Sequence, residues 1–353
     1  MAEAPVAGAV AIGRNEGPRL EACLASLRPC SPIVYVDSGS TDGSLAIARA
    51  AGAVIVELDT GVPFTAARAR NAGLAALEAA APLAEGGPAL VQFVDGDTAV
   101  RDGWLAAAAA FLGAHPDHAV VCGRRRERFP GASPWNRVID MEWNTPTGDA
   151  RACGGDALMR RKALAGVDGF REDLIAGEEP ELCYRLRRAG WRIHRLDAEM
   201  TWHDAAITRF AQHWRRATRA GWAAVEGWVL HGRGPERYNR HRVRPIAIWG
   251  IALPAIALLS LVVAALAALS AAPVPAWPGL AAALGVAALY PLQAVRVAGH
   301  RRRRGDPWRH ALLYGVVSMI DKPAQAAGAW RYWRQRRAGG PARLIEYRGA
   351  DAG

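Results

Sequence analysis

The sequence predicts an α/β domain with a mostly parallel, doubly wound sheet, followed by a helical hairpin that spans a membrane. Three observations lead to this prediction. Apolar strand-like runs alternate with helical stretches through the front of the 353-residue chain, polar loops follow three of those strands, and residues 246–295 carry no charge. Alternating strands and helices with short connections are typical of a parallel α/β sheet. The uncharged run has room for two helices of about 20 residues, the length that crosses a hydrocarbon core.

The elements of the front follow one another in a regular order. The first helix carries Leu20, Leu24 and Leu27 at helical spacing. In a doubly wound sheet, ligands bind outside the carboxyl ends of the strands, so we expect the site in the loops after the first, second and fourth strands. The predicted strands are 6–12, 33–36, 53–56 and 90–94, and the predicted helices are 18–27, 44–51, 65–81 and 104–112.

Two carboxylates follow the fourth strand. Asp95 and Asp97 come directly after an apolar run and are separated by one glycine. Hard divalent cations prefer oxygen ligands, so the pair suits an ion that in turn holds a phosphate-bearing ligand. The alternative is a solvated turn, because Asp-Gly is a common turn pair.

The loop after the second strand, residues 37–43, has the sequence DSGSTDG. Its acceptor oxygens and small residues suit the close approach of a nucleotide base and ribose. The alternative is an ordinary strand-to-helix turn in which Thr41 or Asp42 caps the next helix. Because Asp42 fits that structural role, we assign the ligand-binding role to Asp37.

Four motifs stand in order along the front of the chain: Val10–Glu16, Val34–Ser44, Ala69–Leu74 and Phe93–Asp97. Their order and spacing over residues 1–230 resemble the family 2 glycosyltransferases of the GT-A fold, which is Rossmann-like with a mostly parallel sheet. The resemblance implies a nucleotide-sugar donor (a UDP- or GDP-sugar), a Mg²⁺ or Mn²⁺ ion and inversion at the anomeric carbon.

The same resemblance implies roles for single residues. It assigns Asp95 to the ribose or the metal and Asp97 to the metal. Judged from its surroundings alone, an arginine on an Ala-rich helix such as Arg70 is more often solvated than functional. The donor-binding residues that the resemblance implies are Asn15, Glu16, Asp37, Arg70 and Asp95.

A second chemical centre is predicted at residues 177–186. Pro180 suits the first helical position, which makes Glu179 the expected N-cap. The helix dipole alone favours glutamates at a helix start, so electrostatic capping is the alternative. The stretch resembles the family's Glu-Asp pair, whose second acid is the catalytic base. This implies Glu179 as the base, with Glu in place of the usual Asp, and Glu178 beside the acceptor. A positioned carboxylate can take the proton that an acceptor hydroxyl loses as it attacks.

Further stretches add to the expected site. Gly154, Gly155 and Asp156 match the turn that lines the acceptor pocket in the family, although related sequences often have a neutral polar residue in place of Asp156. His203 matches a third metal ligand of some relatives, whereas a lone histidine is usually structural. We expect the basic run 124–128 to be a solvated face or loop, with contact to an anionic acceptor as the alternative.

Two spans fit the uncharged stretch, Ile246–Ser270 and Gly279–Val297, joined by a proline-rich turn. Their flanks, 233–244 and 296–304, are basic, and the positive-inside rule therefore predicts that both lie in the cytoplasm. The alternative is a buried hairpin of a soluble protein. We expect residues 308–333 to form an interfacial or re-entrant helix pair, broken at Asp321-Lys322-Pro323.

Charge and cysteine content agree with this location. The net charge of +11 comes from the back, since residues 1–199 sum to −4 and residues 200–353 to +15. Arginines that border apolar spans indicate an anionic membrane as partner and argue against nucleic acid. The five cysteines are scattered and show no Cys-x-x-Cys spacing, which argues against a disulfide framework and suits a reducing compartment. The start of the chain lacks the pattern of a signal peptide.

Together these features predict a multi-pass protein of the bacterial inner membrane with a cytoplasmic catalytic domain. It would move a sugar to a hydroxyl of a lipid-linked or envelope glycan acceptor. Two other interpretations stay open: a polyprenyl-phosphate sugar synthase, and a nucleotide-binding membrane scaffold without turnover. The predicted parts are a GT-A domain (1–230), a basic juxtamembrane linker (231–245), a transmembrane hairpin (246–298), and a basic loop, interfacial helices and tail (299–353).

Overall fold

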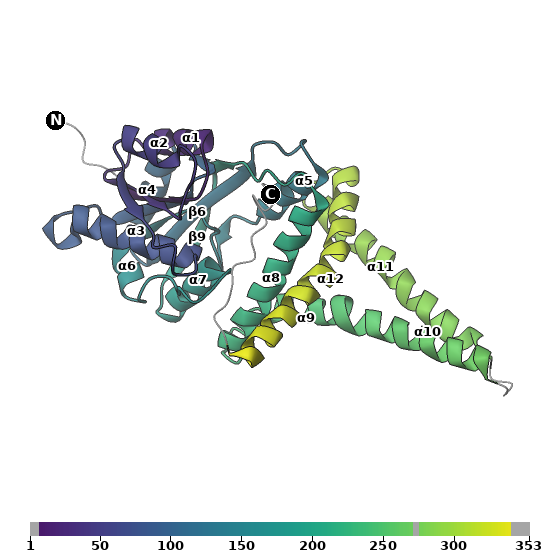
Figure 1. Ribbon diagram of the computed structural model, residues 1–353. Coiled ribbons are helices and arrows are strands. Elements are labelled where there is room, and N and C mark those ends of the chain that lie inside the picture. Colours follow the sequence, from purple (N-terminus) through teal and green to yellow (C-terminus); the bar gives the residue numbers. More distant parts are fainter. Residues whose placement is uncertain (1–6, 271–274, 340–353) are drawn as a thin grey trace. The chain divides into compact units, whose positions relative to one another are not determined.

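The computed structural model describes residues 7–270 and 275–339, and these divide into two compact units. Figure 1 shows the chain coloured along its length. The division falls after residue 206, ahead of the predicted end of the catalytic domain at residue 230. Among the described residues, the first unit holds 7–132 and 142–206, and the second holds 133–141, 207–270 and 275–339.

One mixed sheet organises the first unit. Its strands are β1 (Gly8–Gly13), β2 (Ile33–Asp37), β3 (Val54–Glu57), β4 (Leu90–Asp95), β5 (Thr98–Val100), β6 (His118–Glu127), β7 (Gly148–Asp149), β8 (Ala157–Arg160) and β9 (Arg192–His203). Their order is β3-β2-β1-β4-β8-β6-β9-β5, and β7 pairs with β9. The first four strands in this order are parallel, and β8 runs antiparallel to both β4 and β6. The predicted α/β fold class is thereby confirmed.

The helices of this part cover the sheet. α3 packs on β1 and β2, α4 packs on β6, and α7 packs on β9. Gly73 allows the close approach of α3, because a Cβ there would lie 2.3 Å from Val10 Cγ1. The helices are α1 (Pro18–Ser26), α2 (Ser44–Ala50), α3 (Ala66–Ala80), the 3₁₀ turn η1 (Leu83–Glu85), α4 (Trp104–Ala114), α6 (Arg161–Ala165) and α7 (Glu178–Arg188), while most of α5 (Pro134–Trp143) belongs to the second unit. All eight strands and helices predicted between residues 6 and 112 are present.

Strand register brings distant loops to one edge of the sheet. Gly13 at the end of β1 is level with Asp37 at the end of β2, and Ile12 is level with Asp95 at the end of β4. On the other side, His203 at the end of β9 is level with Glu127 of β6. The carboxyl edge of the sheet therefore collects polar residues from β1, β2, β4, β6 and β9.

The second unit is helical. It contains α8 (Phe210–His231), α9 (Arg240–Ala247), the π-helical turn η2 (Ile248–Ala252), α10 (Leu253–Leu269), α11 (Trp277–Arg303) and α12 (Trp308–Ala338). The helices at Arg240–Leu269 and Trp277–Arg303 are long and apolar enough to cross a membrane, and they include the two predicted spans except for Ser270. Pro254, the second residue of α10, follows the π turn, and its missing N–H leaves the carbonyl of Gly250 within that turn without an α-helical partner. Part of the predicted proline-rich turn, residues 271–274, lies outside the described residues.

Residues 308–338 form one continuous helix, α12, where the sequence predicted two. The helix passes through Pro323 because it packs along α8 and α11, and because Asp321 is engaged in a buried contact. Its Oδ1 lies 2.6 Å from His213 Nε2 of α8. The predicted tail lies, from residue 340 on, outside the described residues.

Candidate active site

Two acids and one histidine meet at the carboxyl edge of the sheet. Asp95 ends β4, Asp97 lies in the turn after it, and His203 ends β9. Each offers one ligand atom, and these atoms all lie within 4.8 Å of one another. His203 Nε2 is 3.3 Å from Asp97 Oδ2. Carboxylate oxygens with one imidazole nitrogen form a donor set that suits Mg²⁺ or Mn²⁺, so these residues fit the predicted ion.

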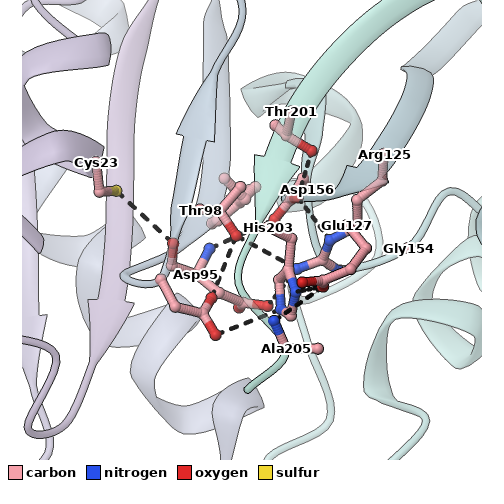
Figure 2. Close-up of polar contacts among 12 residues, drawn as sticks. Cys23, Asp95, Thr98, Arg125, Glu127, Gly154, Asp156, Thr201, His203 and Ala205 are labelled. Carbon is pink, nitrogen blue, oxygen red and sulfur yellow. Dashed lines mark hydrogen bonds and ion pairs between the residues drawn. The ribbon is translucent and has the colours of Figure 1, made fainter. Parts of the chain in front are cut away.

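A buried carboxylate stands behind His203. Glu127 of β6 is 1% exposed, and its Oε2 lies 3.7 Å from His203 Nδ1 (Figure 2). Backbone amides of Phe129 and Ala205 donate to the same carboxylate at 3.0 and 2.9 Å. Glu127 therefore faces the side of the His203 ring that points away from Asp97. The sequence indicated no role for Glu127.

Arg125 joins two of the acids. Its Nη2 lies 3.1 Å from Asp95 Oδ2 and its Nε lies 3.1 Å from Asp156 Oδ2, and its guanidinium stacks 4.8 Å above the Trp143 ring. The prediction that residues 124–128 form a solvated face or loop is wrong for Arg125, whose side chain is 13% exposed within β6. Alternate residues of a strand face opposite sides, which puts Arg125 with Glu127 and leaves Arg126 to pair with Glu199.

Arg70 holds the other side of Asp95. It projects from α3 and is 3% exposed. Its Nη2 lies 2.9 Å from Asp95 Oδ1 and its Nη1 lies 2.7 Å from Glu178 Oε1. The alternative that Arg70 is solvated is therefore wrong. Partial burial would raise the pKa of Asp95, but the guanidinium groups of Arg70 and Arg125 outweigh it and hold that pKa well below its usual range.

Asp156 is completely buried beneath this network. Its Oδ2 accepts from Thr201 Oγ1 at 2.9 Å, and its Oδ1 accepts from the Asp95 amide at 3.4 Å (Figure 2). Burial raises the pKa of Asp156, an effect that Arg125 only partly offsets. These contacts make Asp156 a support for Arg125 and Asp95, while the acceptor contact assigned to it stays a prediction.

The two glycines before Asp156 lie beside the same charges. Gly154 has a φ of +90°, which favours glycine. A Cβ on Gly155 would lie 3.0 Å from Arg70 Nη2 and 3.2 Å from Asp95 Oδ2. A side chain at Gly155 would therefore press on the Arg70–Asp95 pair.

Glu179 lies at the start of α7 in a pocket of sulfur atoms. Its Oε1 accepts from the Cys153 amide at 2.6 Å and from the thiols of Cys153 and Cys183 at 2.9 Å each. Burial raises the pKa of Cys183 to about 11 and raises that of Cys153 well above its usual value, so both thiols stay protonated and donate. The sequence showed no link between these cysteines and Glu179, because they lie 26 residues before and 4 residues after it.

The predicted N-cap is wrong by two positions. Gly177, with a φ of +81°, is the N-cap, and α7 begins at Glu178. Pro180 is therefore the third helical residue, where the N–H has no helical partner to lose. This start brings Glu178 to Arg70 and turns Glu179 towards Cys153.

The loop at Asp37 is tightly bonded. Asp37 Oδ2 accepts from the amides of Gly39 and Ser40 at 2.9 and 2.7 Å. Asn15 Oδ1 accepts from the Thr41 amide at 2.8 Å, which joins the loop after β1 to the loop after β2. Asp42 Oδ1 accepts from the Ser44 amide at 2.9 Å, but the N-cap of α2 is Gly43, one position after the predicted Asp42. Glu16 pairs with Arg19 at 2.9 Å. Donor contacts of Asn15, Glu16 and Asp37 stay predictions.

Comparison with known proteins identifies this arrangement. Residues 11–165 match the family model described as "Glycosyl transferase family 2". "Succinoglycan biosynthesis protein ExoA" of Rhizobium meliloti (strain 1021) is 27% identical over 337 residues, which cover 90% of this chain and 92% of that protein. "Pre-mycofactocin glycosyltransferase" of Mycobacterium tuberculosis is 28% identical over 206 residues, 55% of this chain and 40% of that protein.

A solved structure shares the fold. It is the mannosyltransferase PcManGT from Pyrobaculum calidifontis, in complex with GDP-Man and Mn²⁺. The TM-score is 0.57 at 19% identity, covering 94% of this chain and 88% of that one. With the family match over β1 to β8 and the acids at the carboxyl edge of the sheet, residues 11–165 form a family 2 glycosyltransferase domain, and the chain has the GT-A fold.

Proposed function

We propose that this protein is a membrane-anchored, inverting glycosyltransferase. It moves a sugar from a nucleotide-diphosphate donor to a hydroxyl of a lipid-linked or envelope glycan acceptor. The observation that carries the proposal is the convergence of Asp95, Asp97 and His203, whose ligand atoms lie within 4.8 Å of one another, on the same edge of the sheet as the bonded loop at Asp37.

Asp97, Asp95 and His203 would hold a Mg²⁺ or Mn²⁺ ion, as their donor atoms allow. When bound, the ion stabilises the negative charge of the leaving diphosphate. Glu127 keeps the His203 ring in place from behind. The Mn²⁺ in the PcManGT structure supports this assignment.

The donor would lie across the carboxyl ends of β1, β2 and β4. Asp37 faces the base, Asn15 and Glu16 line the loop beside it, and Arg70 meets the phosphates or the sugar. PcManGT was solved with GDP-Man, which supports a UDP- or GDP-sugar as the donor class. Arg70 is held between Asp95 and Glu178, so its charge is already oriented when a diphosphate arrives.

Glu179 would act as the base. The acceptor hydroxyl attacks the anomeric carbon from the face opposite the diphosphate, the new C–O bond forms as the bond to the phosphate oxygen breaks, and the hydroxyl proton passes to Glu179. The neighbouring Glu178 is engaged in an ion pair with Arg70. Gly154, Gly155 and Asp156 would line the acceptor side together with Glu178.

The two long apolar helices would anchor the protein in the inner membrane. In their most apolar windows only 6% and 11% of the residues are buried, unlike the core helices of a soluble protein. Leu258, Leu266 and Leu284 are 65%, 63% and 70% exposed. Such contiguous apolar surface is stable in lipid and not in water. By the positive-inside rule, the basic flanks would lie in the cytoplasm, at the start of the first span and the end of the second. The catalytic domain would then also be cytoplasmic, beside acceptors of the inner leaflet.

A donor screen tests the proposal. Full-length protein in membranes is supplied with UDP- and GDP-sugars and extracted lipid acceptors, and nucleotide release is measured with Mn²⁺, with Mg²⁺ and with chelator. We expect metal-dependent release that Asp97→Asn and Glu179→Gln abolish. Release that persists in Glu179→Ala would favour a polyprenyl-phosphate acceptor, whose oxygen needs no base. If the protein binds donors but releases no nucleotide with any sugar and acceptor, the proposal that it is an enzyme is refuted.

A further inference from the structure

Three potential metal ligands lie at the end of β9 that is remote from His203. His118 begins β6, Asp149 ends β7, and His194 lies near the start of β9. The register brings them together, since Asp149 is level with His194 and His118 is level with Arg192. Each offers one ligand atom, and these atoms all lie within 4.8 Å of one another. By strand rise, this cluster is roughly 30 Å along β9 from His203.

His118 is prepared as a ligand. Its ring is 2% exposed, and its Nδ1 lies 2.8 Å from Asp117 Oδ1. Because a carboxylate only accepts, the neutral form of this ring carries its proton on Nδ1 and its lone pair on Nε2. That Nε2 atom is buried and has no hydrogen-bond partner among the described residues. A buried acceptor without a partner is unfavourable, and a metal ion would satisfy it.

Arg192 arranges the surrounding carboxylates. Its Nη1 lies 3.3 Å from Asp117 Oδ2, and its Nη2 lies 2.7 Å from Asp149 Oδ2. The other carboxylate oxygen of Asp149, Oδ1, faces His194 and lies 3.7 Å from Nδ1 of that ring. Asp117 thus lies behind the ligand His118, and Arg192 lies behind the ligand Asp149. Such outer contacts orient the ligands of a metal site.

The His194 ring is also held in place by packing. Phe111 stacks on it with ring centroids 4.4 Å apart and meets His118 edge-on at 5.2 Å. One aromatic side chain therefore restrains the orientation of both imidazole rings.

We propose that His118, Asp149 and His194 form a second metal site, for a first-row transition ion such as Zn²⁺. Two imidazoles and one carboxylate favour Zn²⁺ over the hard ions Mg²⁺ and Ca²⁺, in contrast to the two carboxylates at Asp95 and Asp97. The ion ties β7 to the starts of β6 and β9. β7 leads four residues on to Cys153, whose amide holds Glu179, so the site supports the segment that carries this contact. The proposal does not depend on the identity of donor or acceptor.

Metal binding is measured on full-length, untagged protein in detergent. The background is Asp97→Asn, which weakens the predicted active-site ion. After equilibration with Zn²⁺ and dialysis, elemental analysis should find one ion per chain. His118→Gln and Asp149→Asn should each lower this to zero, and Zn²⁺ should raise the melting temperature only in chains that bind it. Asp149 is 64% exposed on its side chain, so its substitution leaves the fold intact even if His118→Gln does not.

His115→Gln is the matched control. His115 lies in the same ring cluster, 5.4 Å from His118, but its Nδ1 is engaged with the Phe111 carbonyl at 2.8 Å, and this variant should keep the ion. Asp117→Asn should weaken binding by about tenfold to a hundredfold, the usual effect of an outer-shell carboxylate. Equal Zn²⁺ content in the parent and in Asp149→Asn would overturn the proposal, as would a thiolate-to-metal absorption band with Co²⁺, which would indicate Cys153 and Cys183 instead.

Discussion

Asp95 lies between two guanidinium groups, and this position limits what it can do. Arg70 and Arg125 approach its two oxygens at 2.9 and 3.1 Å, and they hold its pKa well below the usual range. A carboxylate of such low basicity holds cations and does not accept protons well. Binding and proton transfer are therefore divided between Asp95 and the proposed base, Glu179.

Removing Arg125 should destabilise the protein strongly. Arg125→Met leaves Asp156, which is completely buried, without its cation, a change that typically costs about 3–5 kcal/mol. Arg126→Met is the control, because its partner Glu199 is 40% exposed and such pairs contribute ~0–1 kcal/mol. Thermal unfolding compares the two. Equal losses would show that Asp156 does not need Arg125.

The same variant should have a distinctive pH dependence. Burial raises the pKa of Asp156 in the folded state above its usual value of 3.8, and the loss of Arg125 raises it further. The folded state then binds more protons than the unfolded state, so stability falls as pH rises from about 3.8 through the raised pKa. Unfolding of Arg125→Met measured from acidic to neutral pH should show this fall. The double variant with Asp156→Asn should not.

The sulfur pocket around Glu179 can be tested by substitution. Cys183→Ala removes a donor at 2.9 Å, and we expect kcat to fall by about tenfold, the equivalent of one hydrogen bond of ~1.4 kcal/mol. Cys183→Ser keeps a donor and should stay close to the parent. Because burial raises the pKa of Cys183 to about 11, its thiol should resist iodoacetamide at neutral pH in the folded protein. Full activity in Cys183→Ala would mean that the thiol does not position the base.

At the scale of elements, the contact between α8 and α12 depends on glycine. A Cβ on Gly328 would lie 1.9 Å from the Thr218 carbonyl oxygen, and one on Gly221 would lie 2.0 Å from that of Gln325. The two backbones therefore touch, as in small-residue helix crossings. This close contact explains why α12 continues through Pro323 where its own sequence predicts a break.

Gly328→Ala should separate these helices and destabilise them by about 1–3 kcal/mol, the usual cost of overpacking. Gly285→Ala in α11 is the control, since a Cβ there meets nothing within 4 Å, and it should be neutral or slightly stabilising because alanine favours helix. Melting temperatures of the two variants in the same detergent measure the difference. A neutral Gly328→Ala would mean that the contact is looser than described.

At the scale of the whole molecule, the hairpin makes a topological prediction. The turn should face the periplasm and the basic ends of the helices should face the cytoplasm. All five native cysteines are buried, so a single introduced cysteine can be labelled selectively. In intact cells, an impermeant maleimide should label Ser270→Cys, while Arg303→Cys should react only after permeabilisation. Labelling of both in intact cells would contradict the cytoplasmic location of the catalytic domain.

Sequence alone determined the order of strands and helices, the acids at the strand ends and the two apolar spans, because these follow from the spacing of neighbouring residues. Only the tertiary structure decided that Arg70 is buried, that Arg125 and Glu127 face the site, and that α12 is unbroken. The physical reason is that the position of a buried charged side chain depends on the oppositely charged side chains that lie beside it in the folded protein. Arg125 meets Asp95 and Asp156 through pairing of β6, β8 and β4, and no local pattern records contacts between residues so far apart in the chain.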